Sequence, residues 1–264
     1  MSTIQNALST VQDISSTPIN VEEMSKMIIG NWPKEIPSIY MLCHPEKEVN
    51  RFRRLIPHMI MRGIPKEYLR FVAPTWSDTL EDSIIFKVYD PYLNRGAIPP
   101  FSFKSSCLTK GEISLILNFY SVVQHASNNN SDNQATLVLE SDSYLRRDFV
   151  PRIIKIIQDL SGQDWDYVSL GEGVGTRPPG CETSYYGEQK LYKPPHSWVF
   201  RCTDSMLFSQ KFIKKLAKTL LPFRECLDWE LNFQIALHQG KALWTDPPIC
   251  EQGTCFKRYG TSLT

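Results

Sequence analysis

The stretch Leu137-Val138-Leu139-Glu140-Ser141-Asp142 decides the fold of this 264-residue chain. Together with Ala135-Thr136 it is nearly all apolar up to Leu139, and it then becomes acidic. A run of this kind is typical of a strand that is buried on both faces of a parallel sheet. Because ligands of open α/β sheets bind beyond the carboxyl ends of such strands, Glu140 and Asp142 are the first candidate site residues.

Strand and helix patterns alternate along the rest of the chain. Apolar residues at helical spacing predict helices, and short apolar runs predict strands. The predicted helices are 46–61, a helix from Thr109 that ends before the polar loop 127–132, 149–160, 211–221 and 228–239. The predicted strands are 39–42, 68–72, 135–139, 165–170, one or two within 197–208, and 242–244. The alternation predicts an α/β fold with a mostly parallel central sheet.

Other segments fit this pattern less well. Residues 1–35 are expected to form a leader or a short helix, and residues 36–264 a single domain. Residues 78–100 have no strict period and are interpreted as a variable connection. The Gly- and Pro-rich segment 171–195, which includes Tyr185-Tyr186-Gly187, is expected to be a long surface loop, and loops of this length often act as lids.

Composition excludes several classes of function. The chain carries 29 basic and 28 acidic residues, so its net charge of +1 gives no bulk electrostatic case for binding nucleic acid. No apolar run approaches the ~20 residues of a membrane span, and the N-terminus lacks the pattern of a signal peptide. The seven cysteines are scattered and form no metal-binding spacing, so most are expected to be reduced thiols of the core, as suits a cytosolic chain.

Glu140 and Asp142 form the strongest candidate for chemistry. If the extended conformation persists, residues i and i+2 point the same way, and the two carboxylates can face one ion. Such oxygen ligands suit Mg²⁺ or Mn²⁺, which usually bridges to phosphate oxygens. The other interpretation is a strand-to-loop junction with solvated acids, in which Asp142 caps a turn. The spacing leaves both open.

The stretch Cys226-Leu227-Asp228-Trp229-Glu230 is the second candidate. Asp228 lies near a predicted helix start, where a carboxylate is favoured either as an N-cap or as a base that takes a proton from an acceptor hydroxyl. Trp229 is interpreted either as core or as a flat apolar face for a sugar ring.

Two further groups are weaker candidates. Arg51, Arg53 and Arg54 form a basic cluster that is either a solvated helix face or a contact to a diphosphate. The glycines at 171, 173 and 175 follow a strand, but no helix follows them, so they are not a dinucleotide-binding fingerprint.

Four stretches together resemble glycosyltransferase family 25, which includes lipooligosaccharide and collagen galactosyltransferases and relatives in large DNA viruses. They are Ile39-Tyr40-Met41-Leu42 with Arg51 and Arg54, Leu108-Thr109-Lys110-Gly111-Glu112-Ile113, Leu137-Val138-Leu139-Glu140-Ser141-Asp142, and Leu227-Asp228-Trp229-Glu230-Leu231-Asn232 followed by Pro247-Pro248 and Gln252. The resemblance covers about residues 36–254. Ser141 replaces the middle acid of the family's metal motif, and Asn118-Phe119 and Cys43-His44 also depart from its pattern. These altered positions are expected to line the site.

The resemblance implies a GT-A fold with a Rossmann-like nucleotide-binding half. It also implies a UDP-sugar donor (UDP-galactose or UDP-xylose), Mn²⁺ or Mg²⁺, inversion at the anomeric carbon, and a glycan or glycoprotein acceptor. By this resemblance Glu140 and Asp142 bind the metal, Asp228 is the catalytic base and Glu230 its rival. The implied donor-binding residues are Arg51, Arg54, Ala73, Thr109, Glu112 and Ser141.

The sequence therefore predicts a soluble, cytoplasmic glycosyltransferase, bacterial or viral, acting in the host cytoplasm if viral. Two alternatives remain. One is a non-catalytic module that binds nucleotides or glycans on the same scaffold. The other is a metal-dependent phosphoryl-transfer enzyme or nuclease that uses the same carboxylates.

Overall fold

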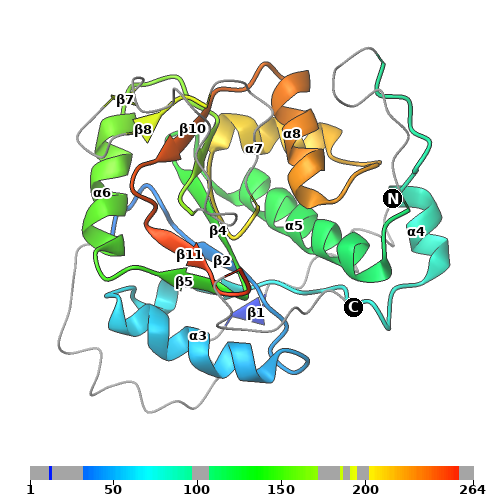
Figure 1. Cartoon of the computed structure of the whole chain (residues 1–264), viewed down its shortest axis with the longest axis horizontal. Helices are drawn as coiled ribbons and strands as arrows, with labels where there is room; N and C mark the ends of the chain where they lie inside the picture. The colour runs from blue at the N-terminus through cyan, green and yellow to red at the C-terminus, as the bar shows by residue number, and fades with distance from the viewer. Residues whose placement is uncertain are drawn as a thin grey trace.

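A nine-stranded mixed sheet forms the centre of the computed structural model, which describes residues 12–13, 32–96, 107–171, 185–186, 191–194 and 202–255. The strand order is β1-β3-β2-β4-β9-β6-β10-β8-β7 (Figure 1). The strands are β1 (Gln12–Asp13), β2 (Ile39–Leu42), β3 (Leu69–Phe71), β4 (Ala135–Glu140), β6 (Tyr167–Ser169), β7 (Tyr185–Tyr186), β8 (Leu191–Tyr192), β9 (Ser205–Ser209) and β10 (Ala242–Thr245). A separate two-stranded sheet pairs β5 (Ser143–Leu145) with β11 (Cys250–Gln252).

Most central strands run in one direction. β2 is parallel to β3 and β4, and β6 is parallel to β10. β9 lies between these groups and is antiparallel to both β4 and β6, so β3, β2, β4, β6 and β10 share one direction. The predicted α/β class with a mostly parallel sheet is therefore confirmed. The reversed β9 has a consequence for the site, because its first residues lie at the same edge of the sheet as the last residues of β4.

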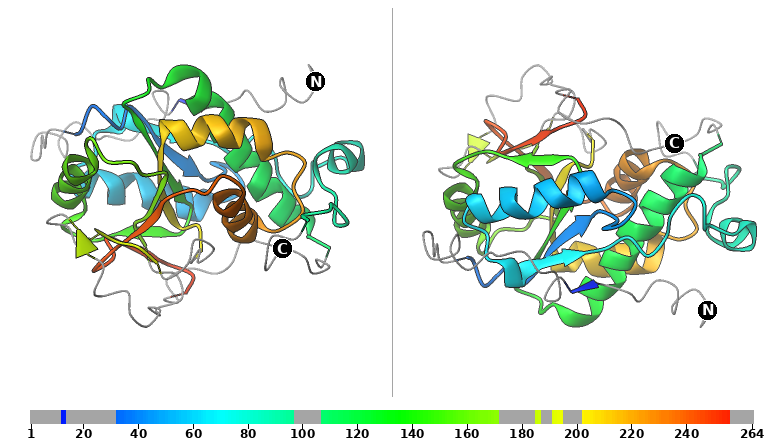
Figure 2. Two further views of the ribbon diagram at one scale, coloured as in Figure 1. Left: turned by 90° about the horizontal axis from the view of Figure 1, so that it is seen from above. Right: turned by 90° about the horizontal axis from the view of Figure 1, so that it is seen from below.

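Helices cover both faces of the sheet, as Figure 2 shows. The helices are α3 (Val49–Met61), α4 (Asp82–Val88), α5 (Lys110–Asn129), α6 (Phe149–Leu160), α7 (Gln210–Thr219) and α8 (Leu227–Leu237), with a 3-10 turn at Lys66–Tyr68. α3 and α6 pack with Met41 and Leu139 on one face, and α5, α7 and α8 pack with Tyr40 and Val138 on the other. Alternate residues of β2 and β4 thus enter opposite cores, which is why β2 is apolar throughout and β4 is almost entirely apolar up to Leu139.

The predicted elements agree closely with the structure where the local pattern is strong. The predicted helix 149–160 is α6 to the residue, and α5 begins with the capping box predicted from Thr109 and Glu112. The Thr109 amide donates to Glu112 Oε2 at 2.8 Å, and the Glu112 amide donates to Thr109 Oγ1 at 3.3 Å.

Three expectations need correction or fall outside the described residues. The segment 78–100 is not only a connection, because it contains α4. The described part of the leader, Gln12–Asp13, is strand β1 rather than a helix. Most of 171–195, including Gly187 of the expected lid, lies outside the described residues, and its described parts β7 and β8 extend the sheet beyond β10.

The described cysteines form no disulfide. Cys43 and Cys250 are buried, as expected for core thiols, whereas Cys107 and Cys255 are exposed.

Candidate functional site

A cavity of about 170 Å³ opens beside the carboxyl ends of β2 and β4. Five of the metal-binding and donor-binding residues that the resemblance implies line it: Arg51, Ala73, Glu140, Ser141 and Asp142. Helix α5 contributes Gly111, Ser114, Leu115 and Asn118, and the segment after β11 contributes Thr254. The cavity therefore lies at the carboxyl ends of the parallel strands, where ligand binding was expected.

Arg51 links α3 to the end of β4. Its guanidinium donates to Ser141 Oγ at 2.6 Å and lies 3.3 Å from Glu48 Oε1. The Ser141 hydroxyl donates to the same Glu48 oxygen at 2.7 Å. Arg51 thus belongs to the site rather than to a solvated face, while Arg53 and Arg54 are exposed and do not line the cavity.

Only one of the two carboxylate oxygens of Asp142 has a hydrogen-bond partner among the described residues. Its side chain is almost fully buried, with the residue 4% exposed. Oδ2 accepts a hydrogen bond from the Thr254 amide at 3.2 Å, and the main-chain oxygen accepts one from the Gly253 amide at 2.8 Å. Oδ1 is buried and has no hydrogen-bond partner in the described part of the chain. The interpretation of Asp142 as a solvated acid is therefore wrong.

Glu140 and Asp204 are two further carboxyl groups beside Asp142, and the protein favours their neutral forms. The pKa of Glu140 is raised to about 8, chiefly by burial and then by the charge of Asp142; Asp204 and Asp228 add to the rise, and a hydrogen bond from Thr203 opposes it. Burial likewise raises the pKa of Asp204 to about 7, with Asp142 contributing.

Gly171 packs directly against Asp204. An added Cβ at residue 171 would lie 1.9 Å from Asp204 Oδ2, so only glycine allows this approach. The backbone of residue 171 thereby helps to fix the position of the Asp204 carboxylate.

Asp142 and Glu140 fit a divalent cation of the kind that completes its coordination with water and substrate. Within the described ranges, no group of three or more His, Cys, Asp or Glu side chains is arranged to hold a metal. Mg²⁺ and similar ions are commonly bound through one or two carboxylates, with the remaining ligands from water and phosphate oxygens. The unpartnered Oδ1 of Asp142 and the neighbouring Glu140 supply such a pair.

Asp228 lies in the first turn of α8. The N-cap is Cys226, so the interpretation of Asp228 as the N-cap is wrong. Asp228 Oδ1 accepts from the Trp229 amide at 2.8 Å and from the Cys226 thiol at 3.0 Å. Asp228 is not among the residues that line the cavity, but its charge contributes to the raised pKa of Glu140, so the start of α8 lies near the carboxylate cluster. Trp229 beside it is 38% exposed and is not core.

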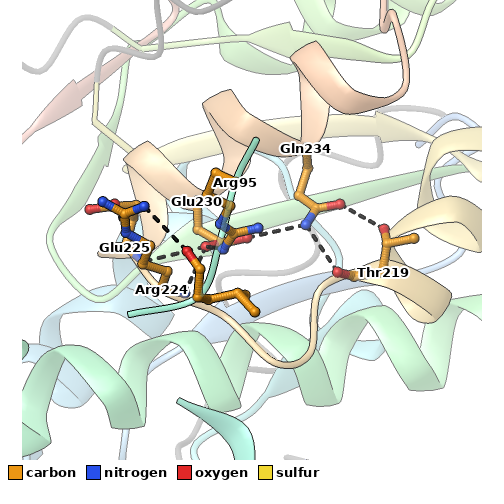
Figure 3. A network of polar contacts seen from close by, with 7 residues as sticks. Arg95, Thr219, Arg224, Glu225, Glu230 and Gln234 are labelled. Carbon is orange, nitrogen blue, oxygen red and sulfur yellow. Dashed lines mark hydrogen bonds and ion pairs between the residues drawn. The ribbon is translucent and has the colours of Figure 1, made fainter. Parts of the chain in front are cut away.

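Glu230 is not part of the cavity. Its side chain is completely buried and forms an ion pair with Arg95, whose guanidinium lies 3.8 Å from the centre of the Phe233 ring. The Glu230 carboxylate also accepts from the Arg224 amide at 3.1 Å and from Gln234 Nε2 at 3.1 Å (Figure 3). With its carboxylate engaged in this way, Glu230 stabilises the start of α8 and is poorly suited to act as a base.

Thr109 and Glu112 are also committed to structure. They form the capping box of α5, and it is Gly111 of the same turn that lines the cavity. Asn118, one of the positions that depart from the family pattern, does line the cavity, whereas Phe119 and Cys43 are core residues.

Several site residues were not identified from the sequence. Glu48, Trp76, Thr203 and Asp204 lie in polar stretches without a motif. The only available signal was the spacing of Glu48 three residues before Arg51, which places the two on one helix face.

Comparison with known proteins gives no family assignment. No protein-family model matches the chain, and no curated protein matches it either. Among the described residues, no helix combines the length and the hydropathy needed to cross a membrane.

Proposed function

We propose that this chain is a metal-dependent glycosyltransferase of the GT-A type that moves a sugar from a UDP-sugar to a hydroxyl of a glycan or glycoconjugate. The observation that carries the proposal is the unpartnered Oδ1 of Asp142, buried at the end of β4 beside Glu140 and at the wall of a cavity that also holds Arg51. UDP-galactose and UDP-xylose are the donors to test first.

The cavity offers complementary groups for one part of such a donor. Asp142 and Glu140 would hold Mn²⁺ or Mg²⁺, which when bound neutralises charge on the departing diphosphate. Arg51 is a cation in the same wall, and Trp76 provides an aromatic surface. Because the cavity of about 170 Å³ is smaller than the roughly 300–1,000 Å³ of sites that enclose a whole ligand, the rest of the donor would extend along the sheet edge.

Asp228 supports the acceptor side of the reaction. Asp228 lies in the first turn of α8, and its carboxylate can accept the proton of the attacking hydroxyl. A hydroxyl deprotonated by Asp228 would invert the anomeric carbon by attacking it on the face opposite the departing diphosphate. The exposed indole of Trp229 offers an apolar face for the acceptor sugar ring.

The decisive experiment measures UDP release from UDP-galactose and UDP-xylose by the whole chain, with a panel of glycan acceptors, in Mn²⁺ and in EDTA. We expect acceptor-dependent release that EDTA and Asp142→Asn both abolish. Asp164→Asn is the matched control, because Asp164 is exposed and pairs with Lys211 and Lys241 at 2.5 Å, outside the cavity. UDP binding without turnover would favour a binding module, and acceptor-independent cleavage of phosphodiesters would favour a phosphoryl-transfer enzyme.

A further inference from the structure

A second, larger cavity lies at the opposite edge of the sheet. Its volume is about 490 Å³, and it is bordered by Ala135 at the start of β4 and by Ser209 at the end of β9. Glu140, at the other end of β4, lines the candidate active site. At ~3.3 Å per strand residue the two cavities are separated by about 17 Å along β4, so the second cavity is a distinct site.

Two tryptophans line this second cavity. Trp32 is 8% exposed, and its indole Nε1 donates to the Ile36 carbonyl at 2.7 Å, which fixes the orientation of the ring. Trp165 is partly buried and packs against the core on the α6 face. Indole rings present flat apolar faces, and they bind best to ligands that combine an apolar face with polar edges.

The polar part of the lining consists largely of amide side chains. Gln158 and Gln163 are exposed at the rim, and Gln210 is completely buried. Gln210 Nε2 donates to the carbonyls of Ala126 and Asn130, at 3.0 and 3.1 Å. Gln210 Oε1, in contrast, has no hydrogen-bond partner among the described residues. Because this oxygen is buried, the polar partners for a ligand are the exposed amides of Gln158 and Gln163, which can both donate and accept hydrogen bonds.

The charge of the lining limits the class of ligand. The charged side chains of the lining residues are those of Glu35 and Asp132, and none of the described lining residues is basic. Phosphorylated and carboxylated ligands are therefore disfavoured. Indole faces, amide groups and the absence of a cation together fit a pyranose, whose C–H face stacks on an aromatic ring while its hydroxyls hydrogen-bond to amides.

We propose that this second cavity binds a neutral oligosaccharide. The proposal goes beyond the glycosyltransferase reaction, because it requires neither Asp142 nor a metal ion. The volume of about 490 Å³ lies within the roughly 300–1,000 Å³ of ordinary ligand sites.

The test titrates the whole chain with lactose, cellotriose and maltotriose at millimolar concentration in EDTA, by saturation-transfer NMR and calorimetry. We expect at least one of these sugars to bind, and Trp165→Ala to weaken its binding about tenfold, with Trp165→Phe retaining part of it. Phe86→Ala is the matched control and should leave binding unchanged, because Phe86 is an exposed aromatic residue on α4 that lines neither cavity. Gln158→Ala, at the exposed rim, is a second variant with little risk to folding.

Several results would overturn the proposal. One is that none of the three sugars binds. Another is that binding is lost in Trp229→Ala but not in folded Trp165→Ala or Gln158→Ala, which would assign it to the candidate active site. A third is that 3′-sialyllactose binds more tightly than lactose, or that adenosine binds more tightly than any sugar in a manner that depends on Trp165. None of these outcomes bears on UDP release, so the two proposals can fail separately.

Discussion

Replacing Asp228 with asparagine separates chemistry from stability at the start of α8. A general base contributes ~10²–10⁴-fold to turnover, which is about 3–5 kcal/mol of barrier. Asparagine keeps Oδ1, so the acceptor of the bonds from the Trp229 amide and the Cys226 thiol is retained. The main structural loss is the interaction of the charge with the helix dipole, worth ~0.3–1 kcal/mol, and relief of the repulsion with Glu140 offsets part of it.

In free energy, the expected loss of catalysis is therefore several times larger than the expected loss of stability, and both can be measured on one sample. We expect Asp228→Asn to lose at least about 100-fold in kcat for UDP release, with near-normal UDP affinity. Its Tm should fall by only a few degrees, at ~2–4 °C per kcal/mol for a chain of this size. Asp82→Asn is the matched control, because Asp82 is also an acid in the first turn of a helix but lies on α4 and, unlike Asp228, does not contribute to the raised pKa of Glu140. Wild-type turnover in Asp228→Asn would refute its role as the base.

Three further results are expected. Asp142→Ala should abolish Mn²⁺-dependent UDP release while the circular dichroism spectrum stays native; undiminished activity of this variant, or of the wild type in EDTA, would remove the metal from the proposal. Glu140 has its pKa raised in the folded chain to about 8, so the stability linked to its protonation is complete below pH ~4.5 and is lost as the pH rises toward 8. The metal-free wild type should thus unfold at a lower temperature at pH 8 than at pH 5, and Glu140→Gln should reduce this decrease; equal slopes for the two proteins would contradict the assignment. Glu230→Gln should lower the free energy of unfolding by about 3–5 kcal/mol, because it leaves Arg95 buried and unpaired; an unchanged urea midpoint would show that the pair contributes little.

The fold was predictable from the sequence where one element carries its own signal. The predicted limits of α6, the capping box at Thr109 and the acidic end of β4 all depend on residues close together in the chain. α4 was missed because it is a helix of only about two turns, in a segment that has no regular apolar period and is followed by prolines. The GT-A assignment, the donor and the metal stay predictions.

The site was predictable only in part, because its chemistry depends on contacts between distant segments. Asp204 stands in a polar stretch whose burial follows from the pairing of Leu139 with Ser205. Glu230 has the sequence context of a surface acid at a helix start, yet its partner Arg95 comes from 135 residues earlier in the chain. Neither placement can be inferred from local spacing.

Because β9 is inserted antiparallel between β4 and β6, the arrangement of the carboxylate cluster depends on the register in which this one short strand pairs with β4. The ladder aligns Leu139 with Ser205 and Ala135 with Ser209, and successive side chains on a strand alternate between the two faces. Deleting one residue inside β9 would therefore exchange the residues that meet α5 and α7 for those that meet α3 and α6. The same deletion would shift Asp204 by ~3.3 Å relative to Glu140. Among variants of this chain, insertions and deletions within 203–209 should thus be eliminated.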